Sequence, residues 1–466
     1  MKLPSVLREI STKLNKQHAK AVVVGGSVRD HFLGLPTKDY DVEIFGLQKI
    51  EELEEILSEY GSVNLVGRNF GVLKFQYQND TYDFSFPRRE KKCGVGHKAF
   101  EIESDGNMSF KEAARRRDFT INAMGYDIEE KRFLDPFGAK DDIQRRRLRC
   151  VDPETFIEDP LRVYRAVQFS ARFKYALTDE TEVLCKEMVK EGMLDALPKE
   201  RIYDEFSKLL LKSEKPSVGF ELMRVLGILN YFPELEAIID TPQDPKWHPE
   251  GDVWVHTMMV VDEMQGILAD EEERREKGKE KKRLKLLFAA LCHDLGKPST
   301  TTREEDGRIR SIGHEQAGVE LTRTFLNRLT SESGFIESIL PFVAHHLKPS
   351  QFYADGVKEK AIRRLATKIN IEELVLLAEA DFLGRTTEEA LAREYEAGAW
   401  LLEKAQNLNV HSAPLANLLM GRDLIALGLE PSDKFKDILE SVYEAMIEGD
   451  IKEYEEAITF VKKRYL

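Results

Sequence analysis

The sequence predicts an α+β protein in which a mixed α/β first part is followed by a long helical remainder. Runs rich in β-branched and aromatic residues, which are typical of strands, occur at 21–26, 41–45, 72–77 and 81–86. These signals fade from about residue 110, and apolar residues recur at helical spacing from 155 to 466. The length of 466 residues exceeds the ~250–300 residues that one hydrophobic core supports, so we expect more than one domain.

The individual elements follow from local patterns. Apolar residues at helical spacing predict a helix over 5–19, and AVVVGG at 21–26 predicts a buried strand that ends in a tight turn. TYDFSF at 81–86 alternates with period two, as a half-buried strand does. The composition changes near residue 150, and the passage at 241–249 is rich in Pro, Trp and His. We expect four parts, over 1–150, 151–240, 241–390 and 391–466.

Composition excludes several classes of protein. An apolar fraction of 42% is too high for a mainly disordered chain, and no apolar run approaches the ~20 residues of a membrane span. The N-terminal segment lacks the apolar region of a secretory signal. The four cysteines stand far apart without a CxxC pair, which favours reduced thiols. We therefore expect a cytoplasmic protein that does not contact a membrane.

Charge is unevenly distributed along the chain. The formal net charge is −14, yet residues 1–150 carry 26 Lys and Arg against 24 Asp and Glu. Basic clusters occur at 88–92, 115–117 and 145–149. Each cluster alone is typical of a solvated face, but three of them in the first third of the chain indicate an anionic partner such as nucleic acid.

The segment 21–46 carries the strongest signal for chemistry. Gly25 and Gly26 end a strand, and a helix is expected to start near Ser27, so backbone N–H groups can approach a phosphate chain. Asp39 and Asp41 stand two apart at the start of the next strand and point to one face, where a cation would offset their repulsion. A glycine turn and a solvated DxD pair are the alternatives. Asp83, on the strand 81–86, is either a third carboxylate of this site or a solvent-facing residue.

Five segments together resemble one family. GGSVRDHFLG and KDYDVEIFG (25–46), ARRRDFTINAM (114–124), LDPFGAKDDIQRRRLR (134–149), EDPLRVYRAVQF (158–169) and KERI (199–202) follow one another in family order. They are similar to the motifs of the class II tRNA nucleotidyltransferase and poly(A) polymerase family of the polymerase β superfamily. The resemblance implies a polymerase β-like nucleotidyltransferase head, with a mixed or antiparallel sheet and helices, over 1–150. It also implies an all-α neck over 151–240 that reads the nucleotide and binds RNA.

The resemblance also implies roles for residues. Asp39 and Asp41, with Asp83 as a catalytic partner, would hold Mg²⁺ and orient a 3′-hydroxyl toward a nucleoside triphosphate. Asp159, Arg162 and Arg165 are three apart, so we expect them on one face of a helix, where the first two match the edge of C or A and the third supports them. Where some relatives have another Arg, this chain has Gln168. The residues expected to bind the nucleotide are Gly25, Gly26, Ser27, Arg29, Arg117, Asp118, Asn122, Asp159, Arg162 and Arg165.

A second set of residues lies between 248 and 385. Histidines and aspartates recur there in the order H…HD…H…H…D, and mixed imidazole and carboxylate ligands suit Ni, Mn, Fe or Mg. LCHDLGKP (291–298) resembles the HD metal-dependent phosphohydrolase superfamily. The resemblance implies Ni²⁺, Mn²⁺ or Mg²⁺ in an HD domain over 241–390, with Lys297 near phosphate. The implied ligands are His256, His293, Asp294 and Asp381, with His314 and His345 as additional ligands and His346 as a weaker candidate.

The combination of both parts resembles the multifunctional CCA-adding subgroup, and 421–440 resembles its C-terminal helical module. This implies addition of C, C and A to tRNA 3′ ends from CTP and ATP by a monomer or homodimer, with an HD activity on 2′,3′-cyclic phosphate or phosphate ends. Three alternatives stay open. They are an A-adding, CC-adding or poly(A)-synthesising enzyme, an HD nucleotidase or phosphodiesterase with a nucleotide-binding head, and a non-catalytic RNA-binding module.

Overall fold

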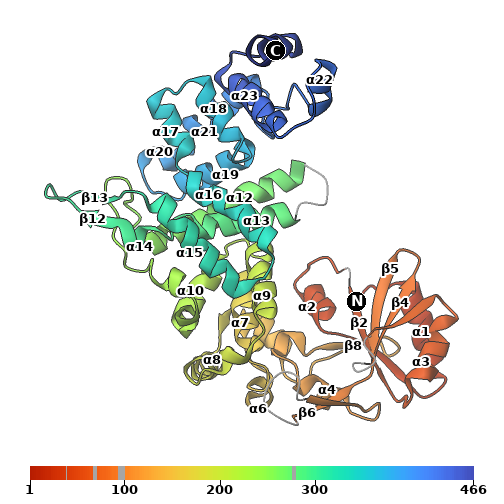
Figure 1. Cartoon of the computed structure of the whole chain (residues 1–466). Helices are drawn as coiled ribbons and strands as arrows, with labels where there is room; N and C mark the ends of the chain where they lie inside the picture. The colour runs from red at the N-terminus through yellow and green to blue at the C-terminus, as the bar shows by residue number, and fades with distance from the viewer. Residues whose placement is uncertain (38, 67–70, 93–99, 275–279) are drawn as a thin grey trace. The chain divides into compact units, whose positions relative to one another are not determined.

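The computed structural model describes residues 1–37, 39–66, 71–92, 100–274 and 280–466. The chain forms two compact units, Met1–Ser213 with Val218–Ile228 and Glu214–Ser217 with Leu229–Leu466 (Figure 1). The α+β class is confirmed, because the sheet belongs to the first unit and helices dominate the second. The finer division into four parts stays a prediction.

The first unit is built on a mixed seven-stranded sheet in the order β3-β4-β5-β2-β1-β8-β9. Strands β2 and β5 are parallel, and the other neighbouring pairs are antiparallel. The bounds are β1 (Lys20–Val24), β2 (Tyr40–Phe45), β3 (Ser62–Val66), β4 (Val72–Tyr77), β5 (Asp80–Ser85), β8 (Gly125–Asp127) and β9 (Arg132–Leu134). The last two strands lie beyond the region where we expected strands, because three-residue strands are too short to show a period.

Helices α1 (Ser5–Asn15) and α3 (Ile50–Ser58) cover one face of this sheet (Figure 1). Their apolar residues pack with Val42, Phe75 and Phe84 in one core. Burial alternates along β5, where Tyr82 and Phe84 are buried and Asp83 is only half-buried. Since successive side chains of a strand leave opposite faces, Asp83 lies on the face away from these helices.

The other elements of the first unit include the two-stranded pairs β6–β7 and β10–β11. A capping box between Ser109 and Glu112 starts α4, and Asp152 caps α6 ahead of Pro153. The bounds are α2 (Gly26–Phe32), β6 (Arg88–Lys92), β7 (Phe100–Ser104), α4 (Phe110–Arg115), α5 (Ala139–Gln144), β10 (Arg147–Leu148), α6 (Pro153–Phe156), α7 (Leu161–Phe173), β11 (Ala176–Leu177), α8 (Asp179–Lys190) and α9 (Lys199–Lys212), and α10 (Ser217–Leu226) follows.

The second unit is a set of helices with one short hairpin. Helix α12 packs on α13 and α19, α13 packs on α16, and α15 packs on α16 (Figure 1). Helices α22 to α24 have an apolar core of their own around Leu424 and Val442. The bounds are α11 (Pro233–Glu236), α12 (Val253–Arg274), α13 (Glu280–Cys292), α14 (Lys297–Thr300), β12 (Thr301–Arg303), β13 (Ile309–Ser311), α15 (His314–Leu329), α16 (Ser333–His345), α17 (Lys348–Asp355), α18 (Glu359–Ala366), α19 (Ile371–Leu383), α20 (Glu388–Leu391), α21 (Glu396–Asn407), α22 (Gly421–Ala426), α23 (Lys434–Glu448) and α24 (Tyr454–Tyr465).

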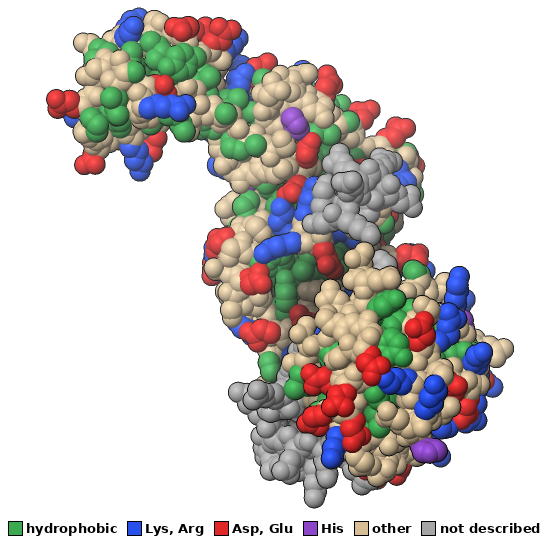
Figure 2. Space-filling view, turned by 90° about the vertical axis from the view of Figure 1, so that its right-hand side faces the viewer, with side chains coloured by type: hydrophobic (Ala, Val, Ile, Leu, Met, Phe, Trp, Pro, Cys, Tyr) green, Lys and Arg blue, Asp and Glu red, His purple; other side chains and the backbone are tan. Residues whose placement is uncertain are grey.

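Surface charge is mixed, and Figure 2 shows Lys and Arg side chains interspersed with Asp and Glu side chains on the face in view. Among the helices built from the described residues, none combines the length and hydrophobicity of a membrane span. A basic, glycine-containing loop over 87–100 and a charged helix end or loop over 270–285 are also indicated by the sequence. Both predictions fall partly on 93–99 and 275–279, outside the described residues.

Candidate active sites

The acidic residues of the head come together on the open face of the sheet. Asp41 on β2 is the direct partner of Asp83 on the parallel strand β5, so the two side chains leave the sheet on the same side. Desolvation by the surrounding protein raises the pKa of the Asp41 carboxyl, and the Arg117 guanidinium opposes that rise. The carboxylates of Asp83, Glu43 and Asp39 raise this pKa further. Carboxylates that repel one another in this way are stabilised by a nearby positive charge, which here is the Arg117 guanidinium.

Gly25 sits where β1 turns into α2, with a φ of 73°. A Cβ at this position would lie 3.1 Å from Nη1 of Arg117 and 3.6 Å from Oδ2 of Asp41. Nη2 of Arg117 also donates to Oε1 of the buried Glu43 at 2.8 Å. Because Gly25 has no side chain, the Arg117 guanidinium and the Asp41 carboxylate lie close to the backbone at this turn. The same lack of a side chain leaves room for a phosphate chain to approach the backbone.

A buried polar chain connects α2 to α7. Nη1 of Arg29 donates to Oδ1 of Asn122 at 2.6 Å, and Nδ2 of Asn122 donates to Oδ1 of Asp118 at 3.0 Å. Nε of Arg165 donates to Oδ2 of Asp118 at 2.7 Å. Burial alone would raise the pKa of the Asp118 carboxyl, but the Arg165 guanidinium and the Asn122 amide outweigh it and lower the pKa. The Arg29 guanidinium also lies 4.7 Å from the ring centre of Phe173.

The three residues expected to choose the base are arranged differently from the expectation. Arg162 and Arg165 lie on α7, but Asp159 precedes the helix, because Pro160 sets the helix start. Oδ1 of Asp159 accepts from the N–H of Leu161 at 3.2 Å, and its Oδ2 accepts from Arg201 at 3.3 Å. Nη1 of Arg162 donates to the carbonyl of Thr155 at 2.6 Å. The expectation of one shared helix face was therefore wrong for Asp159.

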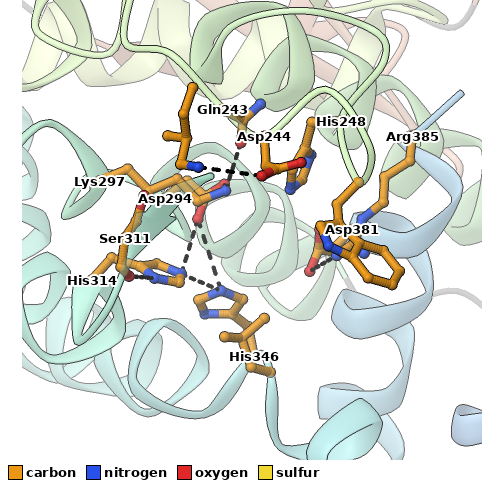
Figure 3. Close-up of a pocket in the computed structure, with 13 residues that line it drawn as sticks. Gln243, Asp244, His248, Asp294, Lys297, Ser311, His314, His346, Asp381 and Arg385 are labelled. Atoms are coloured by element: carbon orange, nitrogen blue, oxygen red, sulfur yellow. Dashed lines mark hydrogen bonds and ion pairs between the residues drawn. The ribbon is translucent and has the colours of Figure 1, made fainter. Parts of the chain in front are cut away.

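In the second unit, five side chains lie next to Asp294, which follows the C-terminal end of α13, and Figure 3 shows three of them, Lys297, His314 and His346. Its Oδ2 lies 3.1 Å from Nε2 of His293 and 2.7 Å from Nζ of Lys297. Its Oδ1 lies 3.3 Å from Nε2 of His314 and 3.9 Å from Nε2 of His346. On the other side, Nε2 of His256 lies 3.9 Å from Oδ2 of Asp294 and 3.0 Å from Oδ1 of Asp381.

A repeated backbone contact orients three of these imidazoles. Nδ1 of His293 donates to the carbonyl of the residue three positions earlier at 2.8 Å, and His314 and His346 do the same at 2.7 and 2.8 Å. Because a carbonyl only accepts, Nδ1 carries the proton in each ring and Nε2 faces Asp294. His256 is oriented by a carboxylate instead, since its Nδ1 lies 2.9 Å from Oε1 of Glu250. Orientation of the far ring nitrogen is typical of metal-ligating histidine.

The donor set fits a divalent metal ion. His256, His293 and Asp294 form one group of closely spaced donors, and Asp294, His314 and His346 form another. Nε2 of His293 and both oxygens of Asp294 are buried and make no well-aligned hydrogen bond with the described residues. Burial, together with the charge of His293, lowers the pKa of His346 to about 3, which leaves its Nε2 lone pair free to bind a cation. Two groups sharing one aspartate match a two-metal centre.

The structure corrects one expected ligand and adds several residues. His345 lies outside these groups, and His346 takes the place that we had favoured for it. Burial lowers the pKa of His345, with Lys368 and Lys348 adding to the effect.

Sequence reasoning had missed four residues. Two of them could have been identified from the sequence, because Glu43 continues the period-two spacing of Asp39 and Asp41, and Glu250 lies six residues before His256. The other two, Gln243 and Arg385, contact Lys297 and Asp381; Arg385 stands four residues after Asp381, which is a local signal, whereas Gln243 had none.

The fold and both sites define a class: a nucleotidyltransferase-type head joined to a metal-binding helical domain. Family models agree, since 21–149 match the poly(A) polymerase head domain, 174–239 match a probable RNA- and SrmB-binding site of polymerase A, and 253–385 match the HD domain. The chain is 34% identical to the multifunctional CCA proteins of Cupriavidus metallidurans and Methylobacillus flagellatus, over 78% of this chain and 84% of theirs. The chain belongs to the multifunctional CCA protein family.

Solved structures share the fold. A CCA-adding enzyme with CTP superposes with a TM-score of 0.63 at 19% identity, covering 99% of this chain and 96% of that one. A Thermotoga maritima CCA-adding enzyme complexed with tRNA gives a TM-score of 0.61 at 18% identity, over 99% and 96% of the two chains. At these identities the likeness shows a common fold.

Proposed function

We propose that this protein adds C, C and A in turn to the 3′ end of tRNA, with CTP and ATP as nucleotide donors. The pairing of Asp41 with Asp83 beside Arg117 and Gly25 carries the proposal. The terminal tRNA hydroxyl oxygen bonds to the α-phosphorus, the bond to the β-phosphate oxygen breaks, and pyrophosphate leaves. Mg²⁺ held by Asp39 and Asp41 would activate the hydroxyl and neutralise the leaving group.

The residues around the acidic cluster have separate tasks in this proposal. Asp83 accepts the hydroxyl proton, and Arg117 pairs with the triphosphate. Asp159 and Arg162 read the base, while Arg165 is held in place by Asp118. A carboxylate and a guanidinium together complement the edges of C and A, so the protein itself acts as the template.

Nucleotide incorporation tests this function. Purified protein receives labelled CTP, ATP, Mg²⁺ and tRNA that lacks its CCA end, and product length is read with each nucleotide alone and with both. Full addition with both nucleotides supports the proposal, whereas A-only, CC-only or long poly(A) products support the related enzymes. The double variant Asp39→Ala/Asp41→Ala should be inactive, while Asp80→Ala, at the exposed start of β5, should retain activity. Activity in the double variant contradicts the proposal.

We infer a second activity for the residues His256, His293, Asp294, His314, His346 and Asp381, which we call the Asp294 cluster. This activity is hydrolysis of 2′,3′-cyclic phosphate or terminal phosphate on a ribose. The shared carboxylate between two groups of donors supports it. A water oxygen bonds to phosphorus, one P–O bond to the ribose breaks, and the water proton passes to the leaving oxygen. Ni²⁺, Mn²⁺ or Mg²⁺ at the cluster would lower the pKa of that water. Loss of hydrolysis in His293→Ala, with CCA addition retained, is the expected result.

We place the protein in the cytoplasm, as a monomer or homodimer. Cys150, Cys185 and Cys292 are buried free thiols, which agrees with a reducing compartment. Light scattering of the purified chain decides the oligomeric state, and a stable trimer or larger assembly contradicts this part of the proposal.

A further inference from the structure

A cavity of about 250 Å³ adjoins the Asp294 cluster (Figure 3). The loop 243–248, the hairpin β12–β13 and the end of α19 contribute to its walls. Sites that enclose a whole small molecule usually measure ~300–1,000 Å³. A phosphate and its neighbouring sugar suit the smaller space, so the outer part of a larger ligand would lie at the cavity mouth.

Trp247 lines this cavity and keeps 57% of its surface exposed. By contrast, Trp254 is completely buried. Nζ of Lys246 lies over the Trp247 ring, 4.8 Å from its centre. An exposed indole beside a site for phosphate chemistry offers a flat surface on which a nucleobase can stack.

Hydrogen bonds hold the backbone of the loop that carries Trp247 from two sides. The backbone N–H of Trp247 donates to the backbone carbonyl of Asp244 at 3.0 Å. The Asp244 carboxylate accepts from the N–H of Lys246 at 3.0 Å and from the N–H of Ile309 on β13 at 3.2 Å. The loop is thereby tied to the hairpin, and a preorganised surface loses little entropy when a ligand binds.

We propose that Trp247 is the nucleobase platform of this cavity. The ligand is a nucleoside with phosphate on its ribose, whose base stacks on the indole while its phosphate reaches the Asp294 cluster. The proposal deepens, and rests on, the phosphohydrolase function inferred above. Every base has a π face, so the platform selects nucleosides over other phosphate esters without selecting one base.

Kinetics with two substrates test the platform. For adenosine 2′,3′-cyclic phosphate, Trp247→Ala should raise KM by about 5- to 150-fold, the equivalent of ~1–3 kcal/mol of stacking, with kcat nearly unchanged. Trp247→Phe should give a smaller rise. Hydrolysis of glycerol 2,3-cyclic phosphate, which has no base, should not change. Ile312→Ala removes another exposed apolar side chain and serves as the control. An equal rise in KM for both esters, or no rise for either, overturns the proposal.

A binding measurement separates this proposal from the underlying function. The three tryptophans, at 247, 254 and 400, all belong to the second unit. Adenosine 2′-monophosphate should quench the fluorescence of the metal-loaded wild type, and Trp247→Phe should abolish the quenching. If no ester is hydrolysed with any metal, the function fails, yet this quenching still decides the platform. The same quenching measurement with an oligonucleotide that ends in 2′,3′-cyclic phosphate shows whether RNA ends bind the platform as free nucleotides do. Loss of quenching in Trp247→Phe with either ligand supports the proposal.

Discussion

Oε1 of Glu250 lies 2.9 Å from Nδ1 of His256, so a buried carboxylate orients the first imidazole of the Asp294 cluster. The same oxygen lies 2.9 Å from Nδ1 of His248. The charge of Glu250 therefore supports two rings, and its pKa is lowered because hydrogen bonds from His248 and His256 outweigh its burial. A carboxylate behind a ligating imidazole raises the basicity of the ligand.

Removing the charge of Glu250 should weaken metal binding. We expect Glu250→Gln to lower the affinity for Mn²⁺ or Ni²⁺ by about 10- to 100-fold in titration calorimetry, since His256 loses its charged partner. Glu263→Gln is the control, because Glu263 lies on α12 with His256 and pairs with Arg393 at the surface, 2.9 Å away. Equal affinities of the two variants contradict a positioning role.

Adjacent histidines should differ in their effect on the metal centre. We expect His346→Ala to lose about one bound metal equivalent in elemental analysis, because the Nε2 of His346 faces Asp294. His345→Ala should keep its metal, since that ring lies outside the donor groups. If His345→Ala loses metal while His346→Ala retains it, the assignment made from the structure is wrong.

A methyl group at Gly25 should slow nucleotide transfer without unfolding the head. Gly25→Ala places a Cβ 3.1 Å from Nη1 of Arg117, so we expect incorporation to fall at least ~10-fold as that guanidinium shifts. Gly34→Ala shares the strain of a positive φ, 69°, but has open space around its Cβ. Both variants should lose about 1 kcal/mol in chemical denaturation, and only Gly25→Ala should lose activity. Equal activities remove Gly25 from the site.

The Asp118–Arg165 pair should stabilise the first unit in a pH-dependent way. Asp118→Asn should lower the free energy of unfolding by roughly 2–3 kcal/mol, less than the ~3–5 kcal/mol of a fully buried pair, because Arg165 is 32% exposed. The folded pKa of Asp118 is lowered, so its contribution is present above the unfolded pKa of ~3.9 and is lost as pH falls through the folded value. The difference between wild type and variant should therefore shrink in acid. A constant difference down to pH 3 contradicts this origin.

Much of the architecture could be predicted because the apolar patterns of its strands and helices extend over several residues. The alternation in 81–86 and the glycine turn at 25–26 lie where the structure places β5 and the start of α2. Strands β8 and β9 were not predicted, because a strand of three residues is too short to show an alternating pattern. The position of Asp159 was misjudged because spacing alone suggested a helix, although Pro160 marks a first helical turn.

The residues around Asp294 show which part of a site the sequence cannot predict. His293 and Asp294 are recognisable because their motif is continuous, but the choice between His345 and His346 depends on the phase of α16. Ile339 and Val343 are buried on that helix, and His346 continues their stripe at spacings of four and three. Adjacent residues differ by about 100° around a helix, so one position decides which ring meets Asp294. Gln243 meets Lys297, 54 residues further along the chain, only through the tertiary fold and left no local signal.

The alternation along β5 also protects the chemistry of the head against misfolding. A slip of this strand by one residue would bury the Asp83 charge beneath α1 and α3 and turn Tyr82 and Phe84 toward water. Both penalties act on the same error, so the hydrophobic interior enforces the strand alignment that the proposed catalysis needs. Selection for a well-packed sheet is, in this strand, also selection for an intact acidic centre.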